Sequence, residues 1–281
     1  MIYLILSVLS SMAIFVLFKL FSKFKINTLQ AIVVNYVTAF TCGLFFYEGI
    51  IRSEIINADW FAVAVTLGFL FIAIFNVMAL TAQKNGLSVV SVASKMSVII
   101  PVLFGIYVYK ESAGIIKIIG IVLALIAVYL TSIKQKDDTV LTRAIYLPLI
   151  LFIGSGIIDT SVNHFAPKNN IQLFLAVIFG IAGVIGFIII AYKSLRLNQH
   201  FKFKSIPFGI ALGIVNYCSM YFLLKALRVD GFESSSIFTI NNVAIVALST
   251  LIGLLLFKEH ISKTNWIGIV LAMAAIILIS F

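Results

Sequence analysis

The stretch IIGIVLALIAVYL at residues 118–130 recurs as WIGIVLAMAAIIL at residues 266–278, an offset of 148 residues. Three further pairs match in the same order, at offsets of 148 or 145 residues: YKE at 109–111 with FKE at 257–259, Asn85-Gly86 with Asp230-Gly231, and Leu67-Gly68 with Leu212-Gly213. One such match between apolar segments would be chance. An ordered series indicates an internal repeat that spans most of the chain.

The composition shows which solvent surrounds this repeat. Hydrophobic residues make up 62% of the chain and charged residues 11%, whereas soluble domains average roughly 45–50% and about 25%. A helix needs about 20 apolar residues to cross the hydrocarbon of a membrane. Runs of that length predict ten spans, at residues 1–20, 28–47, 60–83, 87–108, 114–133, 143–163, 171–192, 205–228, 232–256 and 264–281.

The most polar linker, KQKDDTVLT at residues 134–142, falls after the fifth expected span. It divides the chain into repeats at 1–137 and 143–281, each with five spans. Because five is odd, the second repeat must enter the membrane upside down relative to the first. Inverted repeats of this kind are typical of secondary transporters. The sequence therefore predicts an all-α integral membrane protein of ten transmembrane helices in two inverted five-helix repeats.

The formal net charge of +10 is concentrated in short connections between the spans. This pattern is the one that positive-inside sorting produces, and it gives no reason to expect a nucleic-acid partner. The larger share of Lys and Arg lies on the side opposite the termini, which the rule would place inside the cell. The N-terminal run MIYLILSVLSSMAIFVLF has no basic start and no small-residue exit, so we expect a retained span. The expected location is the bacterial cytoplasmic membrane.

Ionisable side chains inside a span are functional candidates, because charge is costly in hydrocarbon. Lys95 lies eight residues into the span 87–108, too deep to reach the interface easily. A helix turns about 100° per residue, so Ser88, Ser91 and Lys95 share one face, which must meet protein or water. Pro101 removes a backbone hydrogen bond from the same helix and predicts a kink there.

Other expected spans carry polar side chains as well. Asp159, the only acidic residue well inside a span, shares a face with Ser155 and Asn163. The remaining candidates are Asn76 in span 60–83, Tyr217 and Tyr221 in span 205–228, and Thr239 and Asn242 in span 232–256. Hydrogen bonding between helices is the alternative role for such residues. We predict that Lys95, Ser91, Asp159 and these five side chains, with Asn163, bind the substrate in a central cavity.

Ten spans in two halves, each ending in a K-E turn followed by an I-G-I-V-L-A helix, resemble the EamA-type drug/metabolite transporter superfamily. The resemblance covers nearly the whole chain. It implies that the first, third, fourth, sixth, eighth and ninth spans surround a central cavity, and that the fifth and tenth are peripheral. It also implies termini on the cytoplasmic side, the opposite of what the charge pattern indicates.

These features predict a secondary transporter rather than an enzyme. No nucleotide motif and no metal-ligand spacing of histidines is present, so no cofactor is expected. Lys95 would bind an anionic group of a small substrate, and Asp159 a cationic group or a coupling proton, which suits an amino acid or similar zwitterion. Two alternatives stay open. The Lys95–Asp159 pair could be structural, and the same scaffold could serve a lipid flippase or a membrane-embedded enzyme.

Overall fold

The computed structural model describes residues 2–47, 58–108, 114–132, 146–167, 170–197, 200–227 and 234–279, without the side chains of 234–236, 238 and 239. Every regular element among these residues is an α-helix. The helices are α1 (Ile2–Lys23), α2 (Thr28–Phe45), α3 (Phe61–Lys84), α4 (Leu87–Met96), α5 (Ile99–Val108), α6 (Ile115–Ser132), α7 (Tyr146–Phe165), α8 (Ile171–Leu197), α9 (Ser205–Ala226), α10 (Ser234–Leu255) and α11 (Lys263–Ile279). The YKE tripeptide, Asp230-Gly231 and the 134–142 linker lie outside the described residues.

Each expected span is occupied by helix, and the fourth is divided into α4 and α5. Helix α4 ends at Met96, and α5 begins at Ile99. Pro101 explains the position of this break, because a proline ring clashes with the carbonyl group four residues earlier, here that of Ser97. The Ile100 amide instead donates to the Ser97 carbonyl at 2.9 Å, in the tighter i to i+3 pattern. The predicted kink is therefore a break four residues before the proline.

Seven helical rods among the described residues are long and apolar enough to cross a membrane, with Leu87–Val108 counted as one rod. The others are α1, α2, α3, α7, α8 and α9. Three shorter apolar helices, Ile115–Thr131, Ile240–Leu255 and Lys263–Ile279, fill the other expected ranges. The outer surface is apolar as well: on α8, Val184, Phe187 and Ile188 are each more than 60% exposed, as suits side chains that meet lipid.

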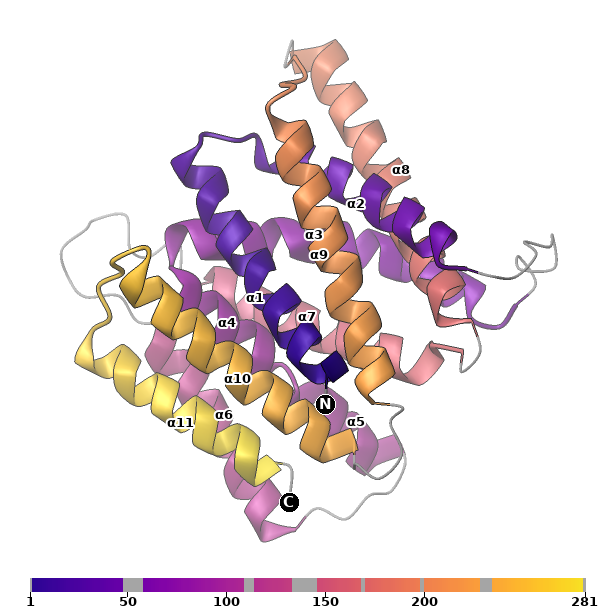
Figure 1. The fold of residues 1–281 in the computed structure, drawn as a ribbon. Coiled ribbons are helices and arrows are strands. Elements are labelled where there is room, and N and C mark those ends of the chain that lie inside the picture. The colour runs from indigo at the N-terminus through magenta and orange to yellow at the C-terminus, as the bar shows by residue number, and fades with distance from the viewer. Residues whose placement is uncertain are drawn as a thin grey trace.

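The helices of the two halves interleave instead of forming two separate bundles (Figure 1). The second helix of each half packs against the third helix of the other: α2 against α9, and α8 against α3. The first helix of each half packs against the third and fourth of the other, α1 on α9 and α10, and α7 on α3 and α4. Equivalent helices also pair, α2 with α8, α4 with α10, and α6 with α11.

The repeated stretches that begin at residues 118 and 266 lie against one another as α6 and α11, at one edge of the bundle (Figure 1). Glycines near the start of each helix allow this contact. A Cβ on Gly120 would lie 2.9 Å from the backbone nitrogen of Ile279, and one on Gly268 would lie 2.7 Å from Thr131 Cγ2. Since the start of each helix meets the end of the other, α6 and α11 run antiparallel.

Candidate functional site

A cavity of about 100 Å³ lies in the interior, where helices of both halves meet. We call it the central cavity. Its walls come from α1, α3 and α4 of the first half and from α7 and α9 of the second. These are five of the six spans that the resemblance places around a cavity; among the described side chains α10 contributes none. The polar lining residues are Ser11, Ser94, Lys95, Ser155, Asp159, Asn216 and Ser219.

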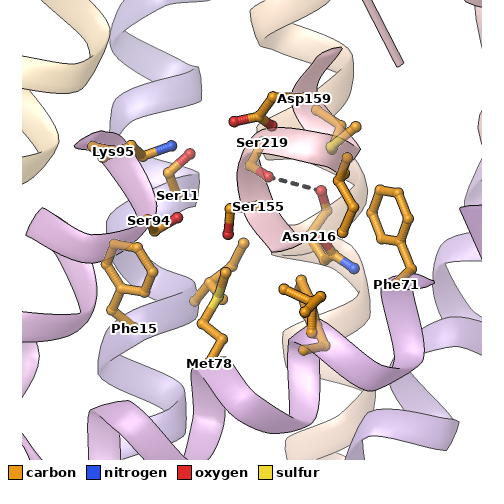
Figure 2. Close-up of a pocket in the computed structure, with 15 residues that line it drawn as sticks. Ser11, Phe15, Phe71, Met78, Ser94, Lys95, Ser155, Asp159, Asn216 and Ser219 are labelled. Carbon is orange, nitrogen blue, oxygen red and sulfur yellow. Dashed lines mark hydrogen bonds between the residues drawn. The ribbon is translucent and has the colours of Figure 1, made fainter. Parts of the chain in front are cut away.

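Two opposite charges face this cavity. Lys95, near the end of α4, and Asp159, on α7, point toward one another in Figure 2. In the described part of the chain they make no direct ion pair; Asp159 Oδ2 instead accepts a long hydrogen bond of 3.4 Å from Ser97 Oγ. A ligand that carried both charges would therefore find a partner for each end.

The Asp159 side chain is exposed to the central cavity and not to the lipid that surrounds the protein. Asp159 is exposed, whereas Ser155 and Ile158 beside it are buried. Residues two apart lie about 200° apart on a helix, so Asp159 faces away from Ile157, whose side chain is on the outer surface. The carboxylate is thus accessible to water inside the protein.

Ser155 supplies a further polar group to the central cavity. Its side chain is only 6% exposed, and its hydroxyl group finds no hydrogen-bond partner among the described residues. A buried hydroxyl group without a partner is destabilising by about 1–3 kcal/mol. A polar ligand or water molecule in the cavity would remove this penalty, so the site is suited to a hydrogen-bonding occupant.

Beside the cavity, a buried polar network links four helices. Asn216 Nδ2 on α9 donates to Asn35 Oδ1 on α2 at 3.1 Å. Ser7 Oγ on α1 lies 3.2 Å from the Ser219 carbonyl oxygen on α9 and 3.2 Å from Asn241 Oδ1 on α10. No pattern in the sequence indicated this network. Its hydrogen bonds join helices that are distant in the sequence, and only the helix packing brings them together.

Several predicted site residues lie away from the cavity. Ser91 is fully buried, and its hydroxyl group donates to the Ser88 carbonyl at 3.0 Å. Asn76 donates to the Ile72 carbonyl at 2.7 Å on its own helix, and its neighbours Phe75 and Met78 line the cavity instead. Local hydrogen bonds to the helix backbone thus occupy both side chains.

The two tyrosines form an aromatic stack instead of a cavity wall. Tyr217 and Tyr221 lie one turn apart on α9, with ring centroids 5.6 Å apart, and Phe46 stacks on Tyr217 at 5.9 Å. Asn163 is exposed near the end of α7. Asn242 is buried and accepts a 3.4 Å hydrogen bond from Asn241. The side chain of Thr239 lies outside the described residues.

The fold and the central cavity define a class: membrane proteins whose helices enclose a water-accessible polar site between two interleaved halves. Comparison with known proteins agrees. Residues 1–133 and 142–281 both match the model of the EamA-like transporter family. The chain is also 31% identical over 286 residues to an uncharacterized protein of Haemophilus influenzae, across 97% of this chain and 95% of that protein.

This chain belongs to the EamA-like transporter family, which confirms the resemblance noted from the K-E turns and the repeated helix. It is an integral, multi-pass membrane protein, and its family consists of membrane transporters of small molecules, not of enzymes.

Proposed function

We propose that this protein is a secondary transporter that moves a small zwitterion, such as an amino acid, across the bacterial cytoplasmic membrane by alternating access. Lys95 binds the carboxylate group of the substrate, and Asp159 binds its ammonium group. The observation that carries this proposal is the presence of two opposite charges on the wall of one central cavity, without a direct ion pair between them among the described residues.

The size and lining of the cavity favour a small polar substrate. Its volume of about 100 Å³ is well below the roughly 300–1,000 Å³ of sites that hold drug-sized ligands. The flippase alternative would need an apolar path for acyl chains. An apolar groove of about 610 Å³ does lie between α2, α3 and α8, but it shares no lining residue with the central cavity.

Alternating access requires two halves that can exchange conformations around a fixed site. The pairing of helices supports ten spans in two inverted five-helix repeats. Exchanging each helix for its repeat equivalent turns the α2–α9 contact into α8–α3, and the α1–α10 contact into α7–α4. The antiparallel course of α6 and α11 fits the same symmetry.

A ligand-stabilisation screen tests the function across several chemical classes of substrate at once. Purified protein in detergent is heated in the presence of amino acids, organic acids or drugs. A ligand at one hundred times its Kd stabilises the folded state by about 2.7 kcal/mol. We expect amino acids to raise the melting temperature, and a response to amphiphilic drugs or lysolipids alone would refute the proposal. Uptake of the responding compound into proteoliposomes, with and without a proton gradient, then tests transport and coupling.

A further inference from the structure

A second cavity, of about 340 Å³, lies at one end of the bundle. We call it the end cavity. It is enclosed by the last turns of α1 and α3, the first turn of α4, and the connection from α10 to α11. Lys19, Lys84 and His260 line it, together with one carboxylate, Glu259. With His260 neutral, its formal charge is positive.

Glu259 shows that this end of the protein is built to hold an oxyanion. Both of its carboxylate oxygens accept from the Leu87 amide at the start of α4, at 3.0 and 2.9 Å. The Lys19 ammonium lies 2.9 Å from Glu259 Oε1. Amides in the first turn of a helix have no partner within the helix, and together with a nearby cation they favour negative charge.

Two glycines leave the space that the carboxylate occupies. A Cβ on Gly86 would lie 2.9 Å from Glu259 Oε2, and a Cβ on Gly253 would lie 2.7 Å from the same atom. Gly86 also has a φ of +102°, a conformation that side chains with a Cβ rarely adopt. The carboxylate therefore sits in a cradle formed by two backbones from different halves of the chain.

Glu259 does not use all of the polar groups in the end cavity. Ser88 Oγ lines it, is buried with its side chain only 5% exposed, and has no hydrogen-bond partner among the described residues. Asn85 Oδ1, which also belongs to this lining, is likewise buried without a partner there. Lys84 makes no ion pair in the described part of the chain. The Lys84 ammonium group and the Ser88 hydroxyl group can donate to one more oxyanion, whereas Asn85 Oδ1 is an acceptor and makes no bond to it.

We infer that the end cavity is a second binding site, which takes a small oxyanion of the carboxylate or phosphate type. Lys84 and Ser88 bind the ligand, and Lys19 is shared with Glu259, so the ligand and the Glu259 carboxylate compete for the same cation. Ser88 and Lys95 are seven residues apart on α4, about 10 Å along its axis. The fully buried Ser91 lies between them on the helix and lines neither cavity. If the proposed transport function holds, the substrate binds in the end cavity before it reaches Lys95 in the central cavity.

The reporter for a binding experiment is Trp266, which follows the cavity residue Asn265 on α11. The chain has one other tryptophan, Trp60, at the opposite end of α3 from Lys84, and Trp60→Phe removes its signal. Detergent-solubilised protein is titrated with inorganic phosphate at constant ionic strength, with chloride as the counter-titrant. We expect a saturable change in Trp266 fluorescence.

Matched variants assign the response to the cavity. Lys84→Gln should weaken phosphate binding, and Glu259→Gln should strengthen it, each by about ten-fold, because one nearby charge is removed from a partly buried site. Lys263→Gln makes the same charge change on another exposed lysine, one that lies outside the lining, and should have no effect. A response that is linear in phosphate, or that Lys84→Gln and Glu259→Gln leave unchanged, would overturn the inference.

Two further measurements identify the source of the oxyanion and test whether the end cavity binds it independently of the central cavity. Trp266 fluorescence is also measured in nanodiscs of phosphatidylglycerol without added phosphate. If these discs reproduce the phosphate-saturated signal, and the Lys84→Gln variant does not show it, the ligand is a lipid headgroup. If the saturable response to phosphate is still seen in nanodiscs of phosphatidylcholine, the ligand is a soluble anion. Lys95→Met should leave the titration intact. Because no transport is measured, failure of the proposed transport function would not affect this result.

Discussion

Lys95 occupies a position where a charge is tolerated only because the central cavity reaches it. Its side chain is half-buried, points toward Asp159 and lies on the wall that α4 contributes. A lysine at this depth in a span has no easy route to the interface, and the absence of a direct ion pair in the described residues leaves its ammonium group available to a ligand. The charge, rather than the length of the side chain, is the property to test.

Lys95→Met keeps the length and the apolar part of the side chain and removes the charge. Removing one partner of a buried charged hydrogen bond weakens binding by roughly 2–5 kcal/mol. We expect the thermal shift with the responding amino acid to disappear, while the melting temperature of the ligand-free protein stays close to that of the wild type. Lys95→Arg should keep part of the response, because the guanidinium group retains the charge but not the shape. A normal shift in Lys95→Met would exclude Lys95 as a substrate ligand.

Asp159→Asn separates substrate binding from a structural role of the same pair. If Asp159 binds the ammonium group, this variant should lose affinity for an amino acid but bind the analogue without the amino group as the wild type does. Binding constants from isothermal calorimetry check this. The structural alternative predicts a different pattern: Lys95→Met would fail to fold, and the added Asp159→Asn substitution would restore folding.

At the scale of the elements, backbone geometry places the functional groups. Pro101 ends α4 just after Lys95, and the glycine at position 86 begins α4 against Glu259. The break at Ser97–Val98 also brings Ser97 Oγ within 3.4 Å of Asp159. A straight helix across residues 87–108 would continue the hydrogen-bond ladder through this point and would not present the same groups to α7.

Gly86→Ala should destabilise the protein and displace the Glu259 carboxylate from its position beside the Leu87 amide. At a φ of +102° and a ψ of 170°, a residue with a Cβ is strained by roughly 1–3 kcal/mol, and the new methyl group would lie 2.9 Å from Glu259 Oε2. We expect a lower melting temperature in detergent. Gly114→Ala is the control, since a Cβ there has no atom within 4 Å. Equal melting temperatures for the two variants would contradict the described geometry.

At the scale of the whole molecule, glycines set how closely the two halves approach. Gly213 on α9 faces α2 so closely that a Cβ would lie 2.5 Å from Thr38 Cβ and 2.6 Å from the Asn35 carbonyl oxygen. Its repeat equivalent, Gly68 on α3, faces Ile181 on α8 in the corresponding contact. Small residues at such crossings are typical of membrane helices, where packing rather than water drives association.

Gly213→Ala should therefore separate α2 from α9 and destabilise the protein by about 1–3 kcal/mol, the usual penalty of overpacking. Gly183→Ala is the matched control on α8, because a Cβ there would make ordinary contacts of 3.7 Å with Tyr36. That variant should be neutral or slightly stabilising, since alanine is the better helix former. Denaturant or thermal unfolding in detergent measures both, and the order of the two stabilities is the test.

The sequence by itself determined that this protein lies in a membrane, where its helices fall along the chain, and that its two halves are repeats of one another. These follow from local properties: apolar runs of membrane length, the proline at 101, and the stretches at 118–130 and 266–278 that recur with their glycines. It also singled out Lys95 and Asp159, because a charge deep in an apolar span is visible without any structure.

Only the tertiary structure decided which polar groups share a cavity. Asn76, Tyr217 and Asn242 are as polar as the residues of the central cavity, but their helices turn them toward a backbone carbonyl group, an aromatic neighbour or another buried side chain. Residues on different helices meet through crossing angles and rotations that side-chain packing sets across the whole bundle, and no local pattern contains that information. Glu259 shows this best: its binding partners, Leu87 and Lys19, lie 172 and 240 residues away along the chain.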